Sequence, residues 1–284
     1  MVQRRRLRAD LQEARLRLGL TQRQVAADLG WSISKLLRVE NGKVGVSRTD
    51  LKALLQLYEV TDQVVIDEYV QMAEQGRKQR WNAYRDILNP SFFRYLEYES
   101  SACQIRQFQH VIPGLLQTEA FAREISIATA PNTPDAILDR QLEVRMARQV
   151  LLDDSISRQL HFVMDESALR RWSQSTHELR TIMYEQLFHL KQLAARPSIT
   201  IQIVPFGVGP YRGMHDPFIL LSFPEERDDD LLFRERGVDS VASQNNPEKI
   251  AGFASRFASL SALALSPNDT TELLDRIAFE QKDP

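Results

Sequence analysis

Residues 20–43 constrain the fold of this chain more than any other stretch. Their sequence, LTQRQVAADLGWSISKLLRVENGK, predicts two short helices joined by a tight turn at Gly30. Thr21 followed three residues later by Gln24 is the pattern of a capping box, in which the two residues satisfy free groups at a helix start. Ser32 is a favoured N-cap for the second helix. The segment is therefore expected to be a helical hairpin with a fixed angle between its helices.

Apolar residues at helical spacing continue on both sides of this hairpin. A helix is expected over residues 3–18, where one apolar stripe crosses an otherwise Arg-rich surface. Two more helices are expected, one capped by Ser47 and one beginning near Asp62. The pattern predicts an all-α domain of five helices over residues 1–76, followed by a polar, charged linker over residues 77–90.

Residues 91–284 alternate between helical and strand patterns. Amphipathic periodicity predicts several helices, and short apolar or alternating runs predict strands between them. The expected strands are 103–108, 160–164, 199–203, 218–223 and 230–233. This alternation predicts a second, larger domain of the α+β or α/β class, which we treat as α+β, with a sheet of four or five strands.

The second helix of the hairpin offers outward side chains suited to reading DNA. A recognition helix packs its inner face on the preceding helix, brings its N-terminal end to base edges and is flanked by phosphate contacts. Arg can bond guanine in a bidentate way, and Ile can touch a thymine methyl group. A helical hairpin with merely solvated charges is the alternative. The candidate DNA-binding residues are Gln22, Arg23, Ser32, Ile33, Ser34, Lys35, Arg38, Asn41 and Lys43.

The charged residues are divided unevenly along the chain. Residues 1–60 hold 12 Lys and Arg against 6 Asp and Glu, whereas residues 61–284 hold 24 against 32. A basic first domain on an acidic body indicates that only the first domain meets a polyanion such as double-stranded DNA. An uneven solvated surface with no partner would give the same count.

The composition is that of an ordinary globular protein, with 43% apolar and 26% charged residues. No apolar run approaches the roughly 20 residues of a membrane-spanning helix. The Arg-rich start has no apolar stretch behind it, so no secretory signal is expected. The single cysteine, Cys103, allows no internal disulfide and suits a reducing compartment. We expect a cytoplasmic protein without membrane contact.

The sequence holds no motif that predicts catalysis. The histidines are scattered along the chain, and none has the short spacing to another histidine or to Cys103 that a metal site needs. There is no Gly-rich phosphate loop and no nucleophile elbow. We therefore expect no catalytic residues, no metal and no cofactor, although a deep pocket with several titratable groups would revive an enzymatic reading. The five histidines are His110, His161, His177, His189 and His215.

Two loops of the second domain could receive an effector. The turn at Pro113-Gly114, which is followed by Gln117, could leave backbone N–H groups facing a cleft, or it could be a tight connection and nothing more. The glycine-rich loop 207–213 holds Tyr211 and Arg212 and could fold over a ligand or partner, or it could be a mobile loop without a role. Four further arginines could receive an anion or simply line solvated helix faces: Arg145, Arg148, Arg170 and Arg171.

The stretch 20–42, including its final Glu40-Asn41-Gly42, resembles the Cro/repressor-type helix-turn-helix family, also called the XRE family. Two residues depart from the usual pattern of the recognition helix: Leu37 where a small polar residue is expected and Ile33 where proline is frequent. The resemblance continues into actinobacterial regulators that join this head to a C-terminal domain of uncharacterised role. It is carried by VIPGLLQTEAFAR at 111–123, VRMARQ at 144–149, MDESALRR at 164–171, LAARP at 193–197, IVPF at 203–206, Gly213 and Pro217-Phe218.

This resemblance implies a five-helix head of the lambda-repressor type and a WhiJ-like, antitoxin-like regulator. Many relatives resemble antitoxins whose partner is a small co-encoded protein, so such a protein is the expected effector. A head of this kind would act as a homodimer on an inverted-repeat operator. Three other readings stay open: an interaction protein that binds DNA only to regulate itself, a regulator that senses a small molecule, and an enzyme with a DNA-binding appendage.

Overall fold

The protein consists of two compact units, Met1–Asn82 and Ala83–Pro284. The computed structural model describes residues 2–40, 46, 48–75, 81–153, 158–171, 176–223, 230–236, 239–243 and 246–282. The division between the units falls within the expected linker. The end of that stretch already belongs to the second unit, where Asp86 accepts two hydrogen bonds from the Arg140 guanidinium at 2.6 and 2.9 Å. The second unit thus begins several residues before the expected position 91.

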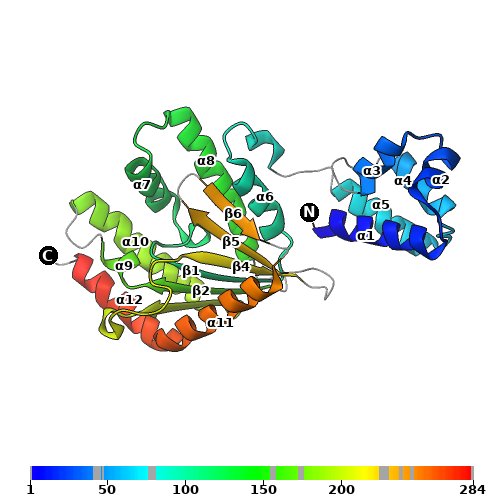
Figure 1. Cartoon of the computed structure of the whole chain (residues 1–284). Helices are drawn as coiled ribbons and strands as arrows, with labels where there is room; N and C mark the ends of the chain where they lie inside the picture. Colours follow the sequence, from blue (N-terminus) through cyan, green and yellow to red (C-terminus); the bar gives the residue numbers. More distant parts are fainter. Residues whose placement is uncertain are drawn as a thin grey trace. The chain divides into compact units, whose positions relative to one another are not determined.

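The first unit is the predicted all-α bundle (Figure 1). Apolar residues from every helix meet in one core, in which Leu36, Leu51 and Leu54 are almost completely buried. Gly30 has a φ of +64°, a left-handed conformation that glycine adopts without strain, so the turn between the second and third helices needs this residue. The helices are α1 (Val2–Arg17), α2 (Gln22–Asp28), α3 (Ile33–Glu40), α4 (Arg48–Leu57) and α5 (Gln63–Gln75).

The second unit alternates helices and strands, as the sequence predicts. Its strands are β1 (Gln104–Gln109), β2 (Gln159–Asp165), β3 (Ile199–Val204), β4 (Phe218–Ser222), β5 (Leu231–Arg236) and β6 (Asp239–Ser243). Its α-helices are α6 (Pro90–Glu99), α7 (Glu119–Thr129), α8 (Asp135–Arg148), α9 (Ser167–Arg170), α10 (His177–Ala194), α11 (Pro247–Leu263) and α12 (Pro267–Lys282). Four single turns of 3-10 helix are η1 (Asn82–Tyr84), η2 (Gly114–Leu116), η3 (Gln149–Leu152) and η4 (Phe206–Val208).

The strands form one mixed sheet in the order β3-β2-β1-β4-β5-β6. β1, β2 and β3 are parallel, and β4, β5 and β6 add to the β1 side as antiparallel neighbours. The sheet has six strands where four or five were expected. The additional strand is β6, whose sequence DSVAS is too short and too polar to give a strand signal by itself. Among the described residues its one partner is β5, at the edge of the sheet.

Helices cover both faces of this sheet (Figure 1). Across one face lies α11, whose Phe253, Phe257 and Leu260 pack on apolar residues from β1 to β5. On the other face lies α6, where the ring of Tyr95 stacks on Phe233 of β5 with centroids 4.4 Å apart. The remaining long helices α10 and α12 pack against each other and against the edge strand β3.

A buried ion pair joins α8 to α6. The guanidinium of Arg148 donates to both carboxylate oxygens of Glu99 at 2.7 and 2.9 Å, and the hydroxyl of Tyr95 donates to Glu99 Oε1 at 2.5 Å. Burial, the largest single effect, would lower the pKa of Arg148, but the charge and hydrogen bonds of Glu99, together with Tyr95, outweigh it and raise that pKa. Because both charges are withdrawn from water, each depends on the other being present.

Replacing Arg148 by Ala should therefore destabilise the second unit. Removing one partner leaves the Glu99 carboxylate buried and unpaired, which costs about 3–5 kcal/mol. Chemical denaturation of the full chain, followed by far-ultraviolet circular dichroism, measures the loss. Arg276→Ala, which removes an exposed arginine of α12, is the control. Equal stabilities for the two variants would show that the buried pair contributes nothing.

Candidate functional site

Glu40, the last residue of α3, joins three helices of the head. Its carboxylate accepts from Arg15 Nε of α1 at 2.7 Å and from Gln22 Nε2 of α2 at 2.6 Å. The side chains of Arg15 and Glu40 are only 7% and 5% exposed. Arg15 also donates to the carbonyl of Leu20, immediately before α2. This network fixes α3 relative to α2, which is the geometry that a helix-turn-helix needs.

The start of α2 is fixed by the predicted capping box. The N–H of Gln24 donates to the Thr21 hydroxyl at 3.3 Å, and the N–H of Thr21 donates to Gln24 Oε1 at 2.9 Å. The start of α3 is capped by a single side-chain bond, in which the Lys35 N–H donates to Ser32 Oγ at 3.1 Å. Two adjacent capped helices and a glycine turn therefore make the hairpin rigid.

The predicted DNA-binding residues fall into two groups. Arg23, Ser32, Ile33 and Ser34 are exposed, the last three around the N-terminal end of α3. Gln22 is instead committed to Glu40, and Lys35 forms an ion pair with Asp50 at 2.9 Å and lies over the Trp31 ring at 3.9 Å from its centroid. The side chains of Gln22 and Lys35 therefore make contacts within the head that stabilise it. The side chain of Arg38, together with Asn41 and Lys43, lies outside the described residues.

Glu40→Ala should loosen the helix-turn-helix. The variant leaves Arg15 buried without its carboxylate and frees Gln22, so the free energy of opening of the head should fall by about 3–5 kcal/mol. Hydrogen–deuterium exchange of the full chain, read on peptides from α1 to α3, measures this change. Glu68→Ala, at an exposed site of α5, serves as control. Equal protection in both variants would contradict the role given to Glu40.

The second unit contains a pocket of about 660 Å³ at the carboxyl ends of its parallel strands. His110 follows β1, Asp165 ends β2 and Pro205 follows β3, and all three line the pocket. Ligands of α/β sheets commonly bind at this edge, because the loops after neighbouring parallel strands diverge there. The further lining residues are Ser167, Arg171, Phe206, Gly209, Pro210, Tyr211, Met214 and His215.

The loop 205–217 makes one wall of the pocket because of the strand order. To connect β3 with β4 it must pass the ends of β2 and β1, a distance of about 14 Å at the usual strand spacing of about 4.8 Å. The loop is held at both ends. The N–H of Phe206 donates to Glu166 Oε2 at 2.8 Å, and Asp216 pairs with Arg256 at 2.6 Å and with Arg234.

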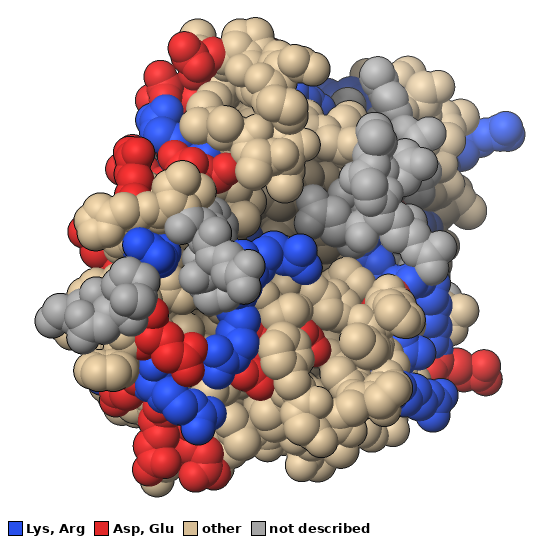
Figure 2. All heavy atoms as spheres, turned by 90° about the vertical axis from the view of Figure 1, so that its left-hand side faces the viewer, with Lys and Arg blue, Asp and Glu red and all other residues tan. Residues whose placement is uncertain are grey.

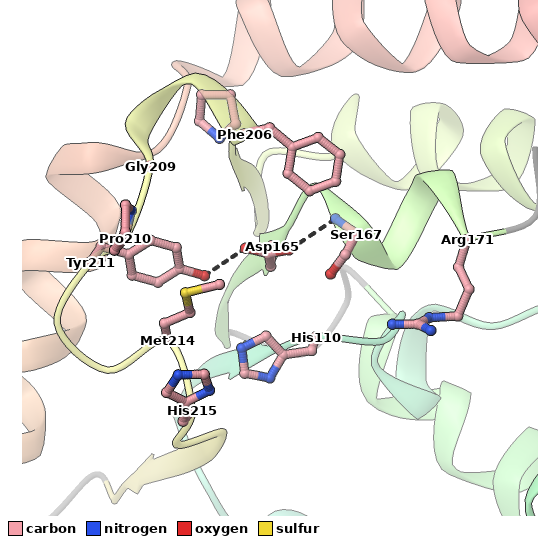
Figure 3. Close-up of a pocket in the computed structure, with 11 residues that line it drawn as sticks. His110, Asp165, Ser167, Arg171, Phe206, Gly209, Pro210, Tyr211, Met214 and His215 are labelled. Carbon is pink, nitrogen blue, oxygen red and sulfur yellow. Dashed lines mark hydrogen bonds between the residues drawn. The ribbon is translucent and has the colours of Figure 1, made fainter.

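Asp165 is the central charged group of the pocket. It is only 6% exposed, and its two oxygens accept from the Ser167 N–H at 2.9 Å and from the Tyr211 hydroxyl at 2.7 Å (Figure 3). Burial by itself would raise the pKa of Asp165, but these hydrogen bonds and the nearby His110 lower it below its ordinary value. Burial and the bond to Asp165 raise the pKa of Tyr211. Asp165 is thus ionised and Tyr211 neutral near pH 7.

Three basic or titratable side chains face Asp165. In the view of Figure 3, His110 and His215 lie below Asp165, and the guanidinium of Arg171, the residue after α9, points toward His110. The His110 ring packs edge-on against Phe108, with centroids 5.1 Å apart. Its Nε2 is shielded from solvent and has no hydrogen-bond partner among the described residues. A residue of the pocket lining therefore carries a buried ring nitrogen that has no hydrogen-bond partner among the described residues.

The structure separates the residues that the sequence proposed for an effector. Tyr211 lines the pocket, whereas Arg212 is exposed in the same loop and does not line it. Pro113 and Gln117 are buried, and Gly114 lies against Arg148. The amide of Gln117 donates to the carbonyl of Ile112 and accepts from Arg145, both at 2.6 Å. The Pro113-Gly114 turn is therefore a tight connection between β1 and α7, and not a cleft.

The four arginines proposed for an anion also separate. Arg145 is bound to Gln117, and Arg148 is bound to Glu99. Arg170 bridges Glu166 at 2.5 Å and Glu280 at 2.6 Å. Only Arg171 of these four lines the pocket. The adjacent Arg170 and Arg171 thus have different contacts: Arg170 ends α9 and is held by two carboxylates, whereas Arg171 follows the helix and lines the pocket.

Most of the pocket was not predicted from the sequence. His110, Asp165 and Pro205 each come directly after, or end, one of the strands β1, β2 and β3, which the sequence did predict. The missed signal is this shared position, since parallel strands bring their carboxyl ends to one edge. Among the described residues, no three His, Cys, Asp or Glu side chains lie close enough together to hold a metal ion.

Tyr211→Phe should raise the pKa of Asp165, because the carboxylate stays buried and loses one donor. A carboxylate with a lowered pKa stabilises the fold at pH values above its unfolded pKa of about 3.9, and this contribution is lost as the pH falls through the folded pKa. In the variant this contribution should be smaller, and its loss should be complete at a higher pH. Carbon-13 NMR titration of the Asp165 carboxyl measures the shift. The control is Tyr184→Phe, at a tyrosine of α10 outside the pocket lining. Equal Asp165 pKa values in the two variants would contradict the effect given to the Tyr211 hydrogen bond.

Two family models match the chain. One is described as a domain of unknown function (DUF5753) and matches residues 92–276, and the other is described as a helix-turn-helix domain and matches residues 6–68. No curated protein and no solved structure matches the chain. None of the helices that the structure describes is long and apolar enough to cross a membrane. The two matched regions coincide with the helical head and with the sheet-containing unit.

Proposed function

This chain belongs to the DUF5753 family, and we propose that it is a transcription regulator that recognises DNA sequence through α3 of its helix-turn-helix head. The observation that carries the proposal is the fixed α2–α3 hairpin, in which the Glu40 network occupies the inner side. The N-terminal end of α3 then presents Ile33 and Ser34 outward. Arg38 lies four residues after Ser34 and so on the same face of the helix.

In this proposal the residues of the head divide between base reading and phosphate binding. Ile33, Ser34 and Arg38 would meet base edges in the major groove, and Arg23 at the start of α2 would meet the phosphate backbone. The excess of basic residues in the head, 12 against 6 over residues 1–60, supports this division. Each phosphate contact releases counterions, so affinity should fall steeply with salt concentration.

We further propose that the regulator belongs to the Cro/repressor-like (XRE) type and binds an inverted repeat as a homodimer. One recognition helix covers only a few base pairs, so two heads on half-sites about one helical turn apart give the specificity that a single head lacks. The actinobacterial origin and the antitoxin-like role are parts of the same proposal, and both rest on the resemblance of the sequence motifs.

The second unit would control the head by binding an effector in a way that differs between DNA-competent and DNA-incompetent states. The sequence resemblance favours a small co-encoded protein as this effector. The pocket at the ends of β1, β2 and β3 favours a small molecule, because its volume of about 660 Å³ is within the roughly 300–1,000 Å³ typical of ligand sites. Purification of the native complex, followed by mass spectrometry of proteins and small molecules, distinguishes the two.

An enzymatic role for this pocket is the other candidate, because it holds several titratable groups. A general acid or base works best when its pKa lies near the working pH. The pKa of Asp165 is lowered and that of Tyr211 is raised, so both move away from neutrality. The Asp165–Tyr211 pair is thus suited to fixing the loop and binding a ligand, and we propose binding without catalysis.

Arg38→Ala should weaken sequence-specific binding by about tenfold to 100-fold. A bidentate Arg–guanine contact contributes about 1–3 kcal/mol of discrimination. Fluorescence anisotropy measures this loss when the full chain is titrated with a duplex that the wild-type protein selects from a random-sequence pool. Binding to an unrelated duplex should change much less.

The matched control is Arg276→Ala, which removes an exposed arginine from the second unit. If Arg38→Ala and Arg276→Ala bind the selected duplex equally well, Arg38 does not read bases. If neither variant nor the wild type forms a saturable complex at low ionic strength, the proposed function itself is wrong.

A further inference from the structure

We infer that the pocket at the carboxyl ends of β1, β2 and β3 binds a small organic anion that carries a flat apolar ring, such as an aromatic carboxylate or an aryl phosphate. The inference rests on the two different sides of this pocket. One side exposes apolar groups, and the other directs basic groups inward. Its regulatory meaning rests on the proposed function, whereas the binding itself does not.

The apolar side is made by the loop 205–217. Phe206 is 56% exposed, although it is a large apolar side chain beside a cavity. Met214 is also exposed and lies between Tyr211 and His215 (Figure 3). Exposed aromatic and thioether groups in a concave site are favourable contacts for a flat ring. Burying such groups against a ligand removes apolar surface from water, which is the main source of binding energy in small-molecule sites.

The basic side is made by Arg171 and His110. The Arg171 guanidinium points into the pocket, and His110 Nε2 is buried there without a partner among the described residues (Figure 3). A planar guanidinium bonds carboxylate and phosphate oxygens in a bidentate way. An anionic group in the pocket would accept such bonds from Arg171, with the His110 ring in the same lining. On the face seen in Figure 2, basic and acidic side chains are interspersed, and basic ones reach its middle.

Asp165 adds selectivity to this site. Both of its oxygens already accept a hydrogen bond, from Ser167 and Tyr211, so its charge is stabilised before any ligand arrives. A bound anion is repelled by this carboxylate and is therefore placed on the Arg171 side. A ring hydroxyl or amino group on the ligand could donate to the remaining lone pairs of Asp165. The site is thus built for a ligand with two distinct ends, and a free inorganic anion would use only one of them.

The dye 8-anilinonaphthalene-1-sulfonate tests this inference, because it is an aromatic anion with a flat naphthalene ring and its fluorescence rises when it is bound. The full chain should show one saturable site. Arg171→Ala should weaken dye binding at least tenfold, because it removes the cation. Phe206→Ala should weaken dye binding at least fivefold. The matched controls are Arg276→Ala and Phe279→Ala on α12, both outside the pocket lining; Phe279 is 69% exposed. Both controls should stay within twofold of the wild type.

Competition against the dye tests the ligand class. Benzoate and phenyl phosphate should displace it, whereas phenol and inorganic phosphate should be at least tenfold weaker. Whichever of benzoate and phenyl phosphate displaces the dye at the lower concentration shows whether the site prefers a carboxylate or a phosphate ester. Displacement by phenol as effective as that by benzoate would overturn the anionic requirement. Dye binding that is not saturable, or that the control substitutions weaken as much as the pocket substitutions, would overturn the site.

The two proposals fail in different ways. The dye titration contains no DNA, so it is independent of the head. Dye binding that depends on Arg171 and Phe206, without binding of any duplex, would support the pocket proposal and contradict the proposed function. Selection of a duplex without a saturable dye site would support the proposed function and contradict the pocket proposal.

Discussion

The Glu40 carboxylate is the interaction on which the head depends. It is buried, and it receives hydrogen bonds from Arg15 of α1 and Gln22 of α2, so three helices are fixed by one charge. A small bundle has little apolar core with which to fix helix angles, and a buried charge that tolerates a single arrangement supplies this precision. The exposed start of α3 can be a reading surface only because its other end is held in this way. DNA recognition and head stability are therefore coupled through one residue.

In the second unit, too, polar contacts hold a functional element in one arrangement. Its strand order forces the loop 205–217 across the ends of two strands, and ion pairs at Asp216 together with the Asp165–Tyr211 bond hold that loop in place. The result is a pocket whose wall is fixed before a ligand binds. Fixed polar groups lose little entropy on binding. An effector that bound here would act on the β2–α9 corner and on this loop, and would change the second unit where its elements converge.

Local features of the fold could be predicted from the sequence. The Thr21–Gln24 capping box and the Ser32 cap were predicted and are present, because each involves residues only three apart. The first five strands were predicted from their apolar pattern, whereas β6 carries too few apolar residues to be recognised. The pocket could not be predicted, because His110, Asp165 and Phe206 are brought together only by the parallel register. The internal bonds of Gln22 and Lys35 were hidden for the same reason, since their partners Glu40 and Asp50 are distant in sequence.

Selection of duplexes from a random-sequence pool by the full-length protein tests the central claim most directly. Repeated rounds at moderate salt should enrich one short motif, arranged as an inverted repeat with half-sites about one helical turn apart. Glu40→Ala, which keeps every outward residue of α3, should fail to enrich that motif. A pool that stays random with the wild-type protein, even at low salt, would contradict the account.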